Sequence, residues 1–548
     1  MISLSVIPIM EKSELISTNR SSWQFGLYFN KQLIQWILCF VTFVFIFIFH
    51  TSPLEISDFW WHLNTGRWIW TNGGMPTDDP FLFSSDIPLD ARASLILRGY
   101  PLSQLIFFGS YTLAGPYALV ALQGLLLTLF YGLLWNYFRQ HKLHPLLAST
   151  IVGLLPILFF RFIDLRPQLF SFIGTLLVMQ QIEYILANER RGRPLKPYVL
   201  LFLPVTMLLW ANLHPGYFIG VGLLFVYLFS EWVARKKGSA SLPDDAFWRF
   251  LAVVLFSVAI TLLNPAGISA ISVVFTTVSG PFSKVIDEYW GTLKYFEFYG
   301  LKNMGYMVVA AAVLPSLALL LKWRELSIAH MLMVVLFLTA GIMAFRFSLL
   351  MVAVILSIAC VYFVRDLNRW LSRAKGIPVI ILWCVSTWFL ANSALNRTAL
   401  PNSPLGSIIP SSAVDYLAQT KPKGNIYNYF GYGGYLSWRL YPQKIYIDQR
   451  GLSWETHEEY LQSWRIDYSE VFHKYQIGVV ISPILNLTTR KRSPLVVRLL
   501  HDNEWAIAYY DRLNIIFIRR DINGGHPVFK DKQMIAEEIL RRLNSTGA

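Results

Sequence analysis

Long apolar runs recur along this chain, and they constrain its fold more than any other feature. After residue 31, these runs repeatedly reach the roughly 20 residues that an α-helix needs to cross a bilayer. They lack the alternation of polar and apolar residues that barrel strands require. Hydrophobic residues make up 55% of the chain and charged residues only 15%, so most of its surface cannot face water. The sequence therefore predicts an α-helical polytopic membrane protein.

Hydropathy predicts about eleven spans. The second apolar run is long enough to contain an interfacial helix as well as a span. The spans are expected at roughly 33–50, 104–135, 147–161, 168–187, 198–212, 217–234, 250–263, 305–321, 328–345, 347–364 and 377–394.

Basic residues fall in every second loop, which predicts the orientation of the spans because lysine and arginine favour cytoplasmic loops. These loops contain Arg139 and Lys142; Arg190, Arg191, Arg193 and Lys196; Arg235, Lys236 and Lys237; Lys322 and Arg324; and Arg365, Arg369, Arg373 and Lys375. We expect the protein to lie in the inner (plasma) membrane of the cell, with its N-terminal tail (1–32) in the cytoplasm. The loops around 51–103, 161–168, 214 and 264–304, and everything after residue 395, are expected outside.

The same distribution accounts for the formal charge of +14. Much of the excess lies in short loops that orient helices and attract anionic lipid, so no nucleic-acid partner is needed to explain it. Cys39, Cys360 and Cys384 all fall in predicted spans and indicate neither a disulfide framework nor a thiolate metal site.

The chain changes character after Asn396, where short strand-like pieces alternate with helical ones. This pattern predicts an extracytoplasmic α/β domain (396–548) beyond the transmembrane domain (33–395). Strands are expected at 425–430, 444–448, 477–481, 505–510 and 515–518, and helices at 412–419, 457–464, 468–475 and 494–501. No Lys-Ser/Thr follows the glycines of 431–435, so a strand-to-helix turn is favoured there over a phosphate-binding loop.

The first outer loop has acidic residues near its start, including Asp58 in the segment Asp58-Phe-Trp-Trp-His62. If Asp58 begins a helix, His62 lies one turn later on the same face, and with nearby Glu55 they could form an acid/base or metal-binding pair. Alternatively, Asp58 caps an interfacial helix while its tryptophans join the aromatic belt. Farther along, Asp78 and Asp79 precede a proline, which is typical of a turn. One of these two carboxylates could also face a ligand.

Cations and polar groups stand at other predicted outer ends. Arg161 and Arg166 oppose the positive-inside tendency. They could bind a substrate phosphate through charge-assisted hydrogen bonds, pair with Asp164 or contact phospholipid headgroups. Asn212 and His214 end another span and could bind a sugar, although a lone histidine is more often structural. Further outer ionisable groups are Arg346, Asp287 and Glu288.

An ordered set of short motifs resembles a bacterial branch of the glycosyltransferase C superfamily. The motifs begin at Asp58 (Asp-Phe-Trp-Trp-His-Leu-Asn-Thr-Gly-Arg-Trp-Ile), Met75 (Met-Pro-Thr-Asp-Asp-Pro-Phe), Leu165 (Leu-Arg-Pro-Gln-Leu-Phe) and Trp210 (Trp-Ala-Asn-Leu-His). The segments Asn428-Tyr-Phe-Gly-Tyr-Gly-Gly-Tyr-Leu and Ile447-Asp-Gln-Arg450 resemble the tail domain of the same branch.

This resemblance implies an inverting hexosyl- or pentosyltransferase that takes a sugar from a polyprenyl-phosphate donor. The acceptor would be a glycan, lipid or protein, and the acid that serves as general base would be Asp58. The superfamily often has two acids close together at this point, whereas Phe59 follows Asp58 here and Glu55 is the nearest acid, so a divalent metal is left open. A lipid-linked glycan transporter and a noncatalytic membrane assembly protein are the alternatives.

Overall fold

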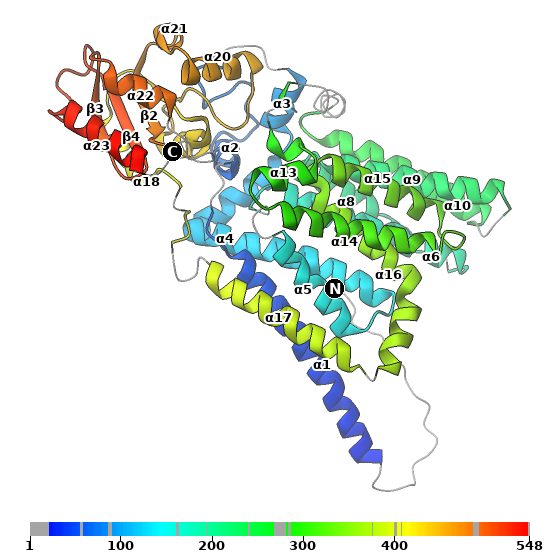
Figure 1. The fold of residues 1–548 in the computed structure, drawn as a ribbon. Helices are drawn as coiled ribbons and strands as arrows, with labels where there is room; N and C mark the ends of the chain where they lie inside the picture. The colour runs from blue at the N-terminus through cyan, green and yellow to red at the C-terminus, as the bar shows by residue number, and fades with distance from the viewer. Residues whose placement is uncertain are drawn as a thin grey trace.

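Long helices and one small sheet make up the fold (Figure 1). It is a computed structural model that describes residues 21–545, apart from 55–57, 86–89, 160–163, 194, 239–241, 268–280, 283–285, 375, 399–402, 407 and 486–492. The first helix begins at Ser21, inside the segment 1–32 that was expected to be a cytoplasmic tail.

Eight described helical regions are long and apolar enough to cross a membrane, and three shorter apolar helices accompany them. The long ones contain α1 (Ser21–His50), α4 (Pro101–Gln140), α6 (Gln168–Arg190), α9 (Tyr217–Lys236), α10 (Asp244–Ala259) with η1 (Ile260–Leu263), α14 (Lys302–Leu320), α16 (Ser348–Arg373) and α17 (Ile377–Arg397). The shorter ones are α5 (Pro145–Leu158), α7 (Pro197–Leu200) with α8 (Phe202–Leu213), and α15 (Ile328–Met343). The predicted polytopic helical architecture is confirmed.

The second apolar run forms two helical pieces with different directions. Within α4, Ala114 and Gly115 leave the helical conformation, and Gly115 has a φ of 60°. Pro116 follows, and a proline removes a backbone donor and disfavours a helical conformation at the residue before it. The sequence therefore breaks this run at the Gly-Pro pair, in agreement with the prediction of more than one element in it.

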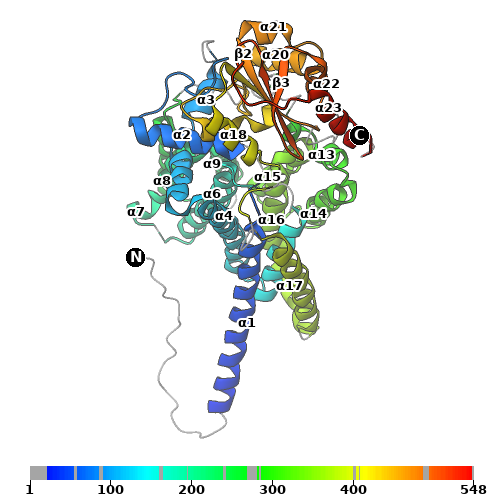
Figure 2. The same ribbon diagram turned by 90° about the vertical axis from the view of Figure 1, so that its left-hand side faces the viewer.

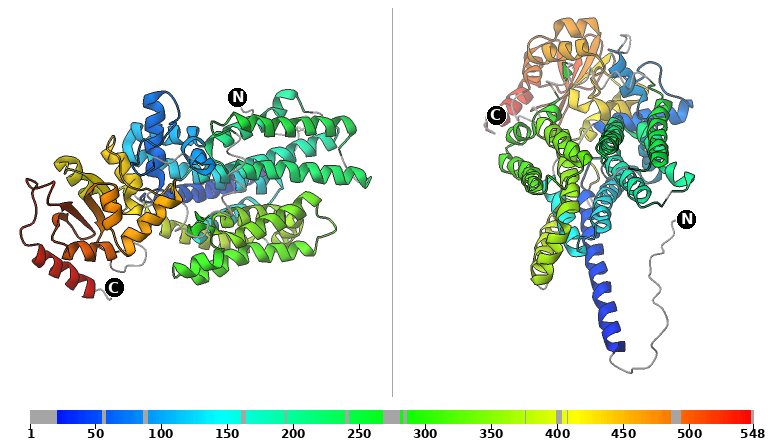
Figure 3. Two further views of the ribbon diagram at one scale, coloured as in Figure 1. Left: turned by 90° about the horizontal axis from the view of Figure 1, so that it is seen from above. Right: turned by 90° about the vertical axis from the view of Figure 1, so that its right-hand side faces the viewer.

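Loops that carry the basic residues contact one another. The Asn368 amide donates to the carbonyl of Lys142 (2.8 Å), and the ammonium of Lys322 lies 3.8 Å from Asp366. These contacts join the α4–α5 loop, the α14–α15 loop and the end of α16. The C-terminal domain lies at one end of the helical bundle, and α1 projects away from it (Figure 2, Figure 3).

A four-stranded sheet forms the centre of the C-terminal domain, in the order β1 (Asn425–Asn428), β2 (Ile477–Pro483), β4 (Asn514–Arg519), β3 (Trp505–Tyr510). The β1–β2 pair is parallel and the other two pairs are antiparallel. Successive residues of β2 and β4 pack into two different cores, because strand side chains alternate between faces. One face is covered by α20 (Trp454–Arg465), α21 (Ser469–Lys474), α22 (Pro494–His501) and α23 (Lys532–Ser545), and the other by α18 (Ser411–Thr420).

Most predicted elements of this domain are present, with one correction. Residues 444–448 form no strand of the sheet, and Ile445 makes only isolated bridges, to Leu82 and Ile426. The backbone of this segment is instead satisfied by the first loop, because the amide of Ile445 donates to the carbonyl of Phe81 (3.0 Å). The glycine-rich turn leads from β1 through η4 (Phe430–Tyr432) into α19 (Gly433–Leu440), as predicted.

A fully buried ion network fastens the first loop to the C-terminal domain. The Arg450 guanidinium donates two hydrogen bonds to the Asp79 carboxylate (3.1 and 3.0 Å). Its Nε donates to Asp448 (2.8 Å), and all three side chains are inaccessible to solvent. Nearby, Arg92 donates to the carbonyls of Arg450 and Gly451. These contacts hold the first loop between the two parts of the protein.

Replacing Asp79 by asparagine should destabilise the protein, because the Arg450 guanidinium would exchange one of its two carboxylate partners for a neutral amide. A hydrogen bond to a charged group typically contributes about 1.5–3 kcal/mol. The matched control is Asp78→Asn, because Asp78 is exposed. Thermal unfolding in detergent should show a lower midpoint for Asp79→Asn than for Asp78→Asn. Equal midpoints for the two variants would contradict the role of the network.

A close helix crossing holds α2 (Asp58–Asn72) against α4. A methyl group on Gly66 would lie only 2.1 Å from the backbone oxygen of Gln104. The other face of α2 meets α19, where the Asn64 amide donates to the carbonyl of Ser437 (3.0 Å). These contacts fix α2, and therefore the residue at its start.

Substituting Gly66 by alanine should force α2 away from α4. Overpacking of this kind typically costs about 1–3 kcal/mol. Gly132→Ala, on α4 itself, is the control, because an added methyl group there meets nothing within 4 Å. Thermal unfolding should separate the two variants, and an unchanged midpoint for Gly66→Ala would refute the tight crossing.

Candidate functional site

A cavity of about 1700 Å³ lies where the helical bundle meets the C-terminal domain. The ends of several helices and the turns between them supply one part of its wall, which includes Asp58, Arg166, His214 and Arg346. The turn before α19 and the segment around Arg450 supply another. Turns that the charge pattern predicted on one side of the membrane therefore meet at one cavity.

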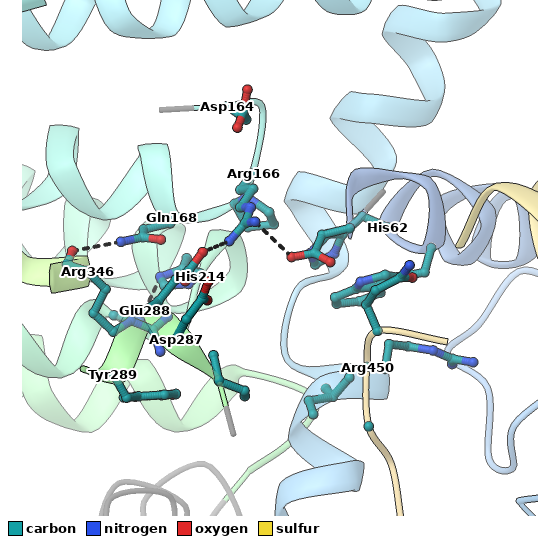
Figure 4. A pocket seen from close by; sticks show the side chains of 18 of the residues that line it. His62, Asp164, Arg166, Gln168, His214, Asp287, Glu288, Tyr289, Arg346 and Arg450 are labelled. Atoms are coloured by element: carbon teal, nitrogen blue, oxygen red, sulfur yellow. Dashed lines mark hydrogen bonds and ion pairs between the residues drawn. The ribbon is translucent and has the colours of Figure 1, made fainter. Parts of the chain in front are cut away.

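Arg166 lies between two carboxylates in this cavity (Figure 4). One terminal nitrogen of its guanidinium is 3.1 Å from Oδ2 of Asp58, and the other donates to Oε1 of Glu288. The three residues come from the start of α2, the turn before α6 and the short helix η2 (Asp287–Tyr289). One cation therefore joins three segments that are distant in the sequence.

Local structure explains how these turns present their side chains. Leu165 is buried and anchors the turn before α6, and the amide of Leu169 donates to the carbonyl of Arg166 (3.1 Å). The Gln168 amide donates to the carbonyl of Arg346 (3.0 Å), which ties this turn to η3 (Phe345–Phe347). In turn, the amide of Phe345 donates to the carbonyl of Trp290, next to η2. Hydrogen bonds thus connect the turns that carry Arg166, Arg346 and Glu288.

The two carboxylates differ in their electrostatics. Burial raises the pKa of Asp58 above its ordinary value, and the opposing effect of Arg166 is smaller. Burial also opposes the charge of Glu288, but Arg166 and Arg346 together outweigh it and lower the pKa of Glu288. Glu288 is therefore the more stable anion, and Asp58 binds a proton more readily.

Both histidines of the site are held neutral. Burial and the neighbouring Arg346 lower the pKa of His214 to about 3. Its Nδ1 accepts from the backbone amide of Gly216 (2.9 Å) and lies 2.7 Å from the hydroxyl of Ser171, so the proton belongs on Nε2. Burial also lowers the pKa of His62 well below its ordinary value. Neutral imidazoles can donate or accept a hydrogen bond without adding charge to the site.

Arg346 is the other cation of this part of the cavity. Its guanidinium lies over the ring of Tyr289, 4.6 Å from the ring centroid, and it has no ion-pair partner among the residues described. A guanidinium held by an aromatic ring can still use its N–H groups to bind an anion.

The remaining predicted site residues lie elsewhere. Asp78 is exposed, Asp79 is buried against Arg450, and the Asn212 amide donates to the carbonyl of Leu208 (2.9 Å). None of these three lines the cavity. Glu55 and Arg161 are outside the described residues. The structure thus brings together Asp58, His62, Arg166, His214 and Arg346.

Sequence reasoning missed two features of the site. The sequence marks Glu288 as an outer acid, but its pairing with Arg166 joins positions too far apart for spacing to reveal. The sequence pattern also presents the C-terminal domain as a separate unit, yet Tyr435, Gln449 and Arg450 line the cavity. The sequence did contain a signal for the pairing of Arg166 with Glu288, because an arginine at the end of an apolar span needs a counter-charge.

No group of three or more His, Cys, Asp or Glu side chains is arranged to hold a metal ion in the part of the chain that the structure describes. Asp58 and Glu288, which share the charged part of the cavity, both direct a carboxylate oxygen to Arg166.

Comparison with known proteins gives structural similarity alone. No family model matches the chain, and no curated protein is similar to it in sequence. The apo oligosaccharyltransferase of Archaeoglobus fulgidus has a TM-score of 0.53 at 11% identity, over 82% of this chain and 69% of that one. The oligosaccharyltransferase AglB of the same archaeon, in complex with an inhibitory peptide and a dolichol-phosphate, gives 0.52 at 9% identity, over 87% and 73%. The Archaeoglobus fulgidus oligosaccharyltransferase in complex with zinc and sulfate gives 0.51 at 11% identity, over 81% and 68%.

These similarities show that the chain shares its fold with an archaeal oligosaccharyltransferase. At identities this low they support a shared architecture, with membrane helices followed by a C-terminal domain.

Proposed function

We propose that the protein is a membrane glycosyltransferase that moves a sugar from a polyprenyl-phosphate donor to an acceptor outside the cytoplasm, with inversion at the anomeric carbon. The observation that carries the proposal is the cavity in which Asp58, Arg166, Glu288, His214 and Arg346 meet. The fold shared with an oligosaccharyltransferase supports the general kind of reaction, the transfer of a lipid-linked glycan.

Asp58 is the proposed general base. Its carboxylate takes the proton of an acceptor hydroxyl while the acceptor oxygen forms a bond to the anomeric carbon. The bond from that carbon to the phosphate oxygen breaks, and its electron pair leaves with the polyprenyl phosphate. A positioned base of this kind typically contributes about 10²–10⁴-fold to the rate. The raised pKa of Asp58 suits this role, because a carboxylate with a higher pKa accepts a proton more readily.

Arg346 is the proposed ligand of the departing phosphate. Both terminal nitrogens of Arg166 are engaged by carboxylates, so Arg166 is less suited to bind the phosphate than the sequence indicated. Arg346 has no such partner in the described chain, and cations placed where negative charge develops stabilise the transition state. His62 and His214 would orient the substrates through hydrogen bonds, because both are neutral.

The wall of the cavity also suits a lipid-linked donor. Ala340, Met343, Phe347 and Leu350, at the junction of α15 and α16, form an apolar part of the lining. Met343 is also 68% exposed, so this part of the wall is continuous with the apolar outer surface of the helices. A polyprenyl chain could leave the cavity here while its phosphate stays near Arg346.

The C-terminal domain is the proposed acceptor side. Tyr429, Tyr435, Gln449 and His457 line the cavity from that domain. The transporter alternative is less well supported, because it predicts polar paths to both membrane faces, and the charged lining groups named here lie at one end of the bundle.

Asp58→Asn should abolish transfer, because an amide cannot take the acceptor proton. We expect a loss of about 10²–10⁴-fold in the rate of sugar transfer from polyprenyl-phosphate donors by the purified protein. The control is Asp521→Asn, an exposed position in the C-terminal domain. Unfolding midpoints should show that both variants fold. Full activity of Asp58→Asn would contradict the assignment of Asp58 as the base. If the protein has a noncatalytic role, neither the wild type nor the Asp521→Asn control will transfer a sugar.

The pH dependence of transfer should report on Asp58. Activity should fall as the pH decreases through the raised pKa of Asp58, because only the carboxylate can act as base. The negative charge of Glu288 helps to raise that pKa, so Glu288→Gln should move the acidic limb of the rate profile to lower pH. Glu470→Gln, at an exposed position, should leave the limb in place. If the acidic limb of Glu288→Gln stays unchanged or moves to higher pH, the Glu288 charge does not raise the pKa of Asp58 in the way proposed.

A further inference from the structure

Arg166 occupies the place where a metal ion shared by the two acids of the site would have to bind. Asp58 and Glu288 lie in the same cavity, and each directs a carboxylate oxygen to a different terminal nitrogen of the same guanidinium. A divalent ion would need these oxygens at about 2.0–2.2 Å. The guanidinium would have to leave before such an ion could bind both acids.

The hydrogen bonds around Arg166 keep its guanidinium in this position. The backbone of its turn is held by the Leu169 amide, and the neighbouring Gln168 side chain is bonded to η3. Its planar head matches two carboxylates at once, which a lysine ammonium on a flexible stem would not do. Arg166 is therefore part of the built structure of the site, and no described side chain competes with it for both acids.

The electrostatics support a permanent cation at this point. The two acids raise the pKa of Arg166 further above its ordinary value, although burial acts in the opposite direction. An arginine remains charged at any physiological pH. In return, its charge opposes the effect of burial on Asp58 and helps to hold Glu288 as an anion.

We propose that the Arg166 guanidinium takes the place of a divalent cation between Asp58 and Glu288, so that this protein works without a metal ion. The role of Arg166 in catalysis rests on the proposed function. Its place between the two carboxylates rests on the geometry alone. Arg166 is a positioning residue here: it orients the Asp58 carboxylate toward the acceptor and holds Glu288 beside it. No step of the transfer passes through a metal.

The first arm of the test uses the wild-type protein in detergent. Treatment with a strong chelator should leave the rate of transfer within about twofold. Added Mn²⁺ or Zn²⁺ should leave the unfolding midpoint unchanged, because Asp58 and Glu288 are already paired with Arg166. The thermal measurement needs no activity, so it decides the metal question even if no donor is ever transferred and the proposed function fails.

The second arm removes the guanidinium. In Arg166→Gln the two carboxylates lose their shared cation, so Mn²⁺ should now raise the unfolding midpoint of the variant. The double variant Arg166→Gln with Glu288→Gln keeps only one acid and should lose this response. Arg166→Lys should transfer more slowly than the wild type, and its acidic limb should lie at a different pH, which a purely structural loss would not produce.

Two results would overturn the proposal. One is an increase in the wild-type midpoint with Mn²⁺ or Zn²⁺ that disappears in Asp58→Asn. The other is a loss of transfer on chelation that added metal restores. If Arg166→Gln does not fold, the response of the wild-type midpoint to metal still decides between the two outcomes.

Discussion

The buried contact of Arg450 with Asp79 and Asp448 is the constraint on which the rest of the site depends. It joins the first loop to the C-terminal domain across 371 residues of sequence, with all three side chains inaccessible to water. Because isolated buried charges are costly, the loop and the domain are held together as a unit. Together with the hydrogen bonds of Asn64 to Ser437 and of Ile445 to Phe81, this contact holds the C-terminal domain against the helical part of the protein, where the cavity lies.

A second set of ionic contacts then organises the cavity from the membrane side. Arg166 draws Asp58 and Glu288 together, while Arg346 remains over the ring of Tyr289. The two arginines therefore have different surroundings: one is saturated by carboxylates, and the other is available to an anion. This difference supports the two proposed roles: Arg166 holds the Asp58 carboxylate for proton transfer, and Arg346 binds the phosphate.

Hydropathy predicted the long apolar helices, because the bilayer requires each span to be long, apolar and internally hydrogen-bonded. Eight described helical regions meet the length of a span, and three of the predicted spans are shorter apolar helices. Strand and turn patterns predicted β1 to β4 and the turn into α19, because those signals are local. Residues 444–448 look like a strand in isolation, but their partner is the first loop rather than the sheet. The break in α4 at Gly115 also had a local signal, the proline that follows it.

The candidate site was only partly predictable. The sequence indicated Asp58, His62, Arg166, His214 and Arg346 one at a time, because each stands at or near the end of an apolar run. Which of them would meet depends on tertiary contacts such as Arg166 with Glu288, 122 positions apart, and no spacing rule reveals these. Asp79, like Asp58, is an acid of the first outer loop, and only the fold shows that Asp79 is buried against Arg450 while Asp58 lines the cavity.

In the proposed function, this cavity binds a lipid-linked phosphate beside Arg346 and presents the attached sugar to Asp58. The most direct measurement is a cryo-EM structure of the purified protein in lipid nanodiscs with an added polyprenyl phosphate. We expect phosphate density within hydrogen-bonding distance of the Arg346 guanidinium, with the lipid chain passing Met343 into the bilayer. A phosphate bound at the opposite end of the helices, or a cavity that stays empty at saturating lipid, would contradict it.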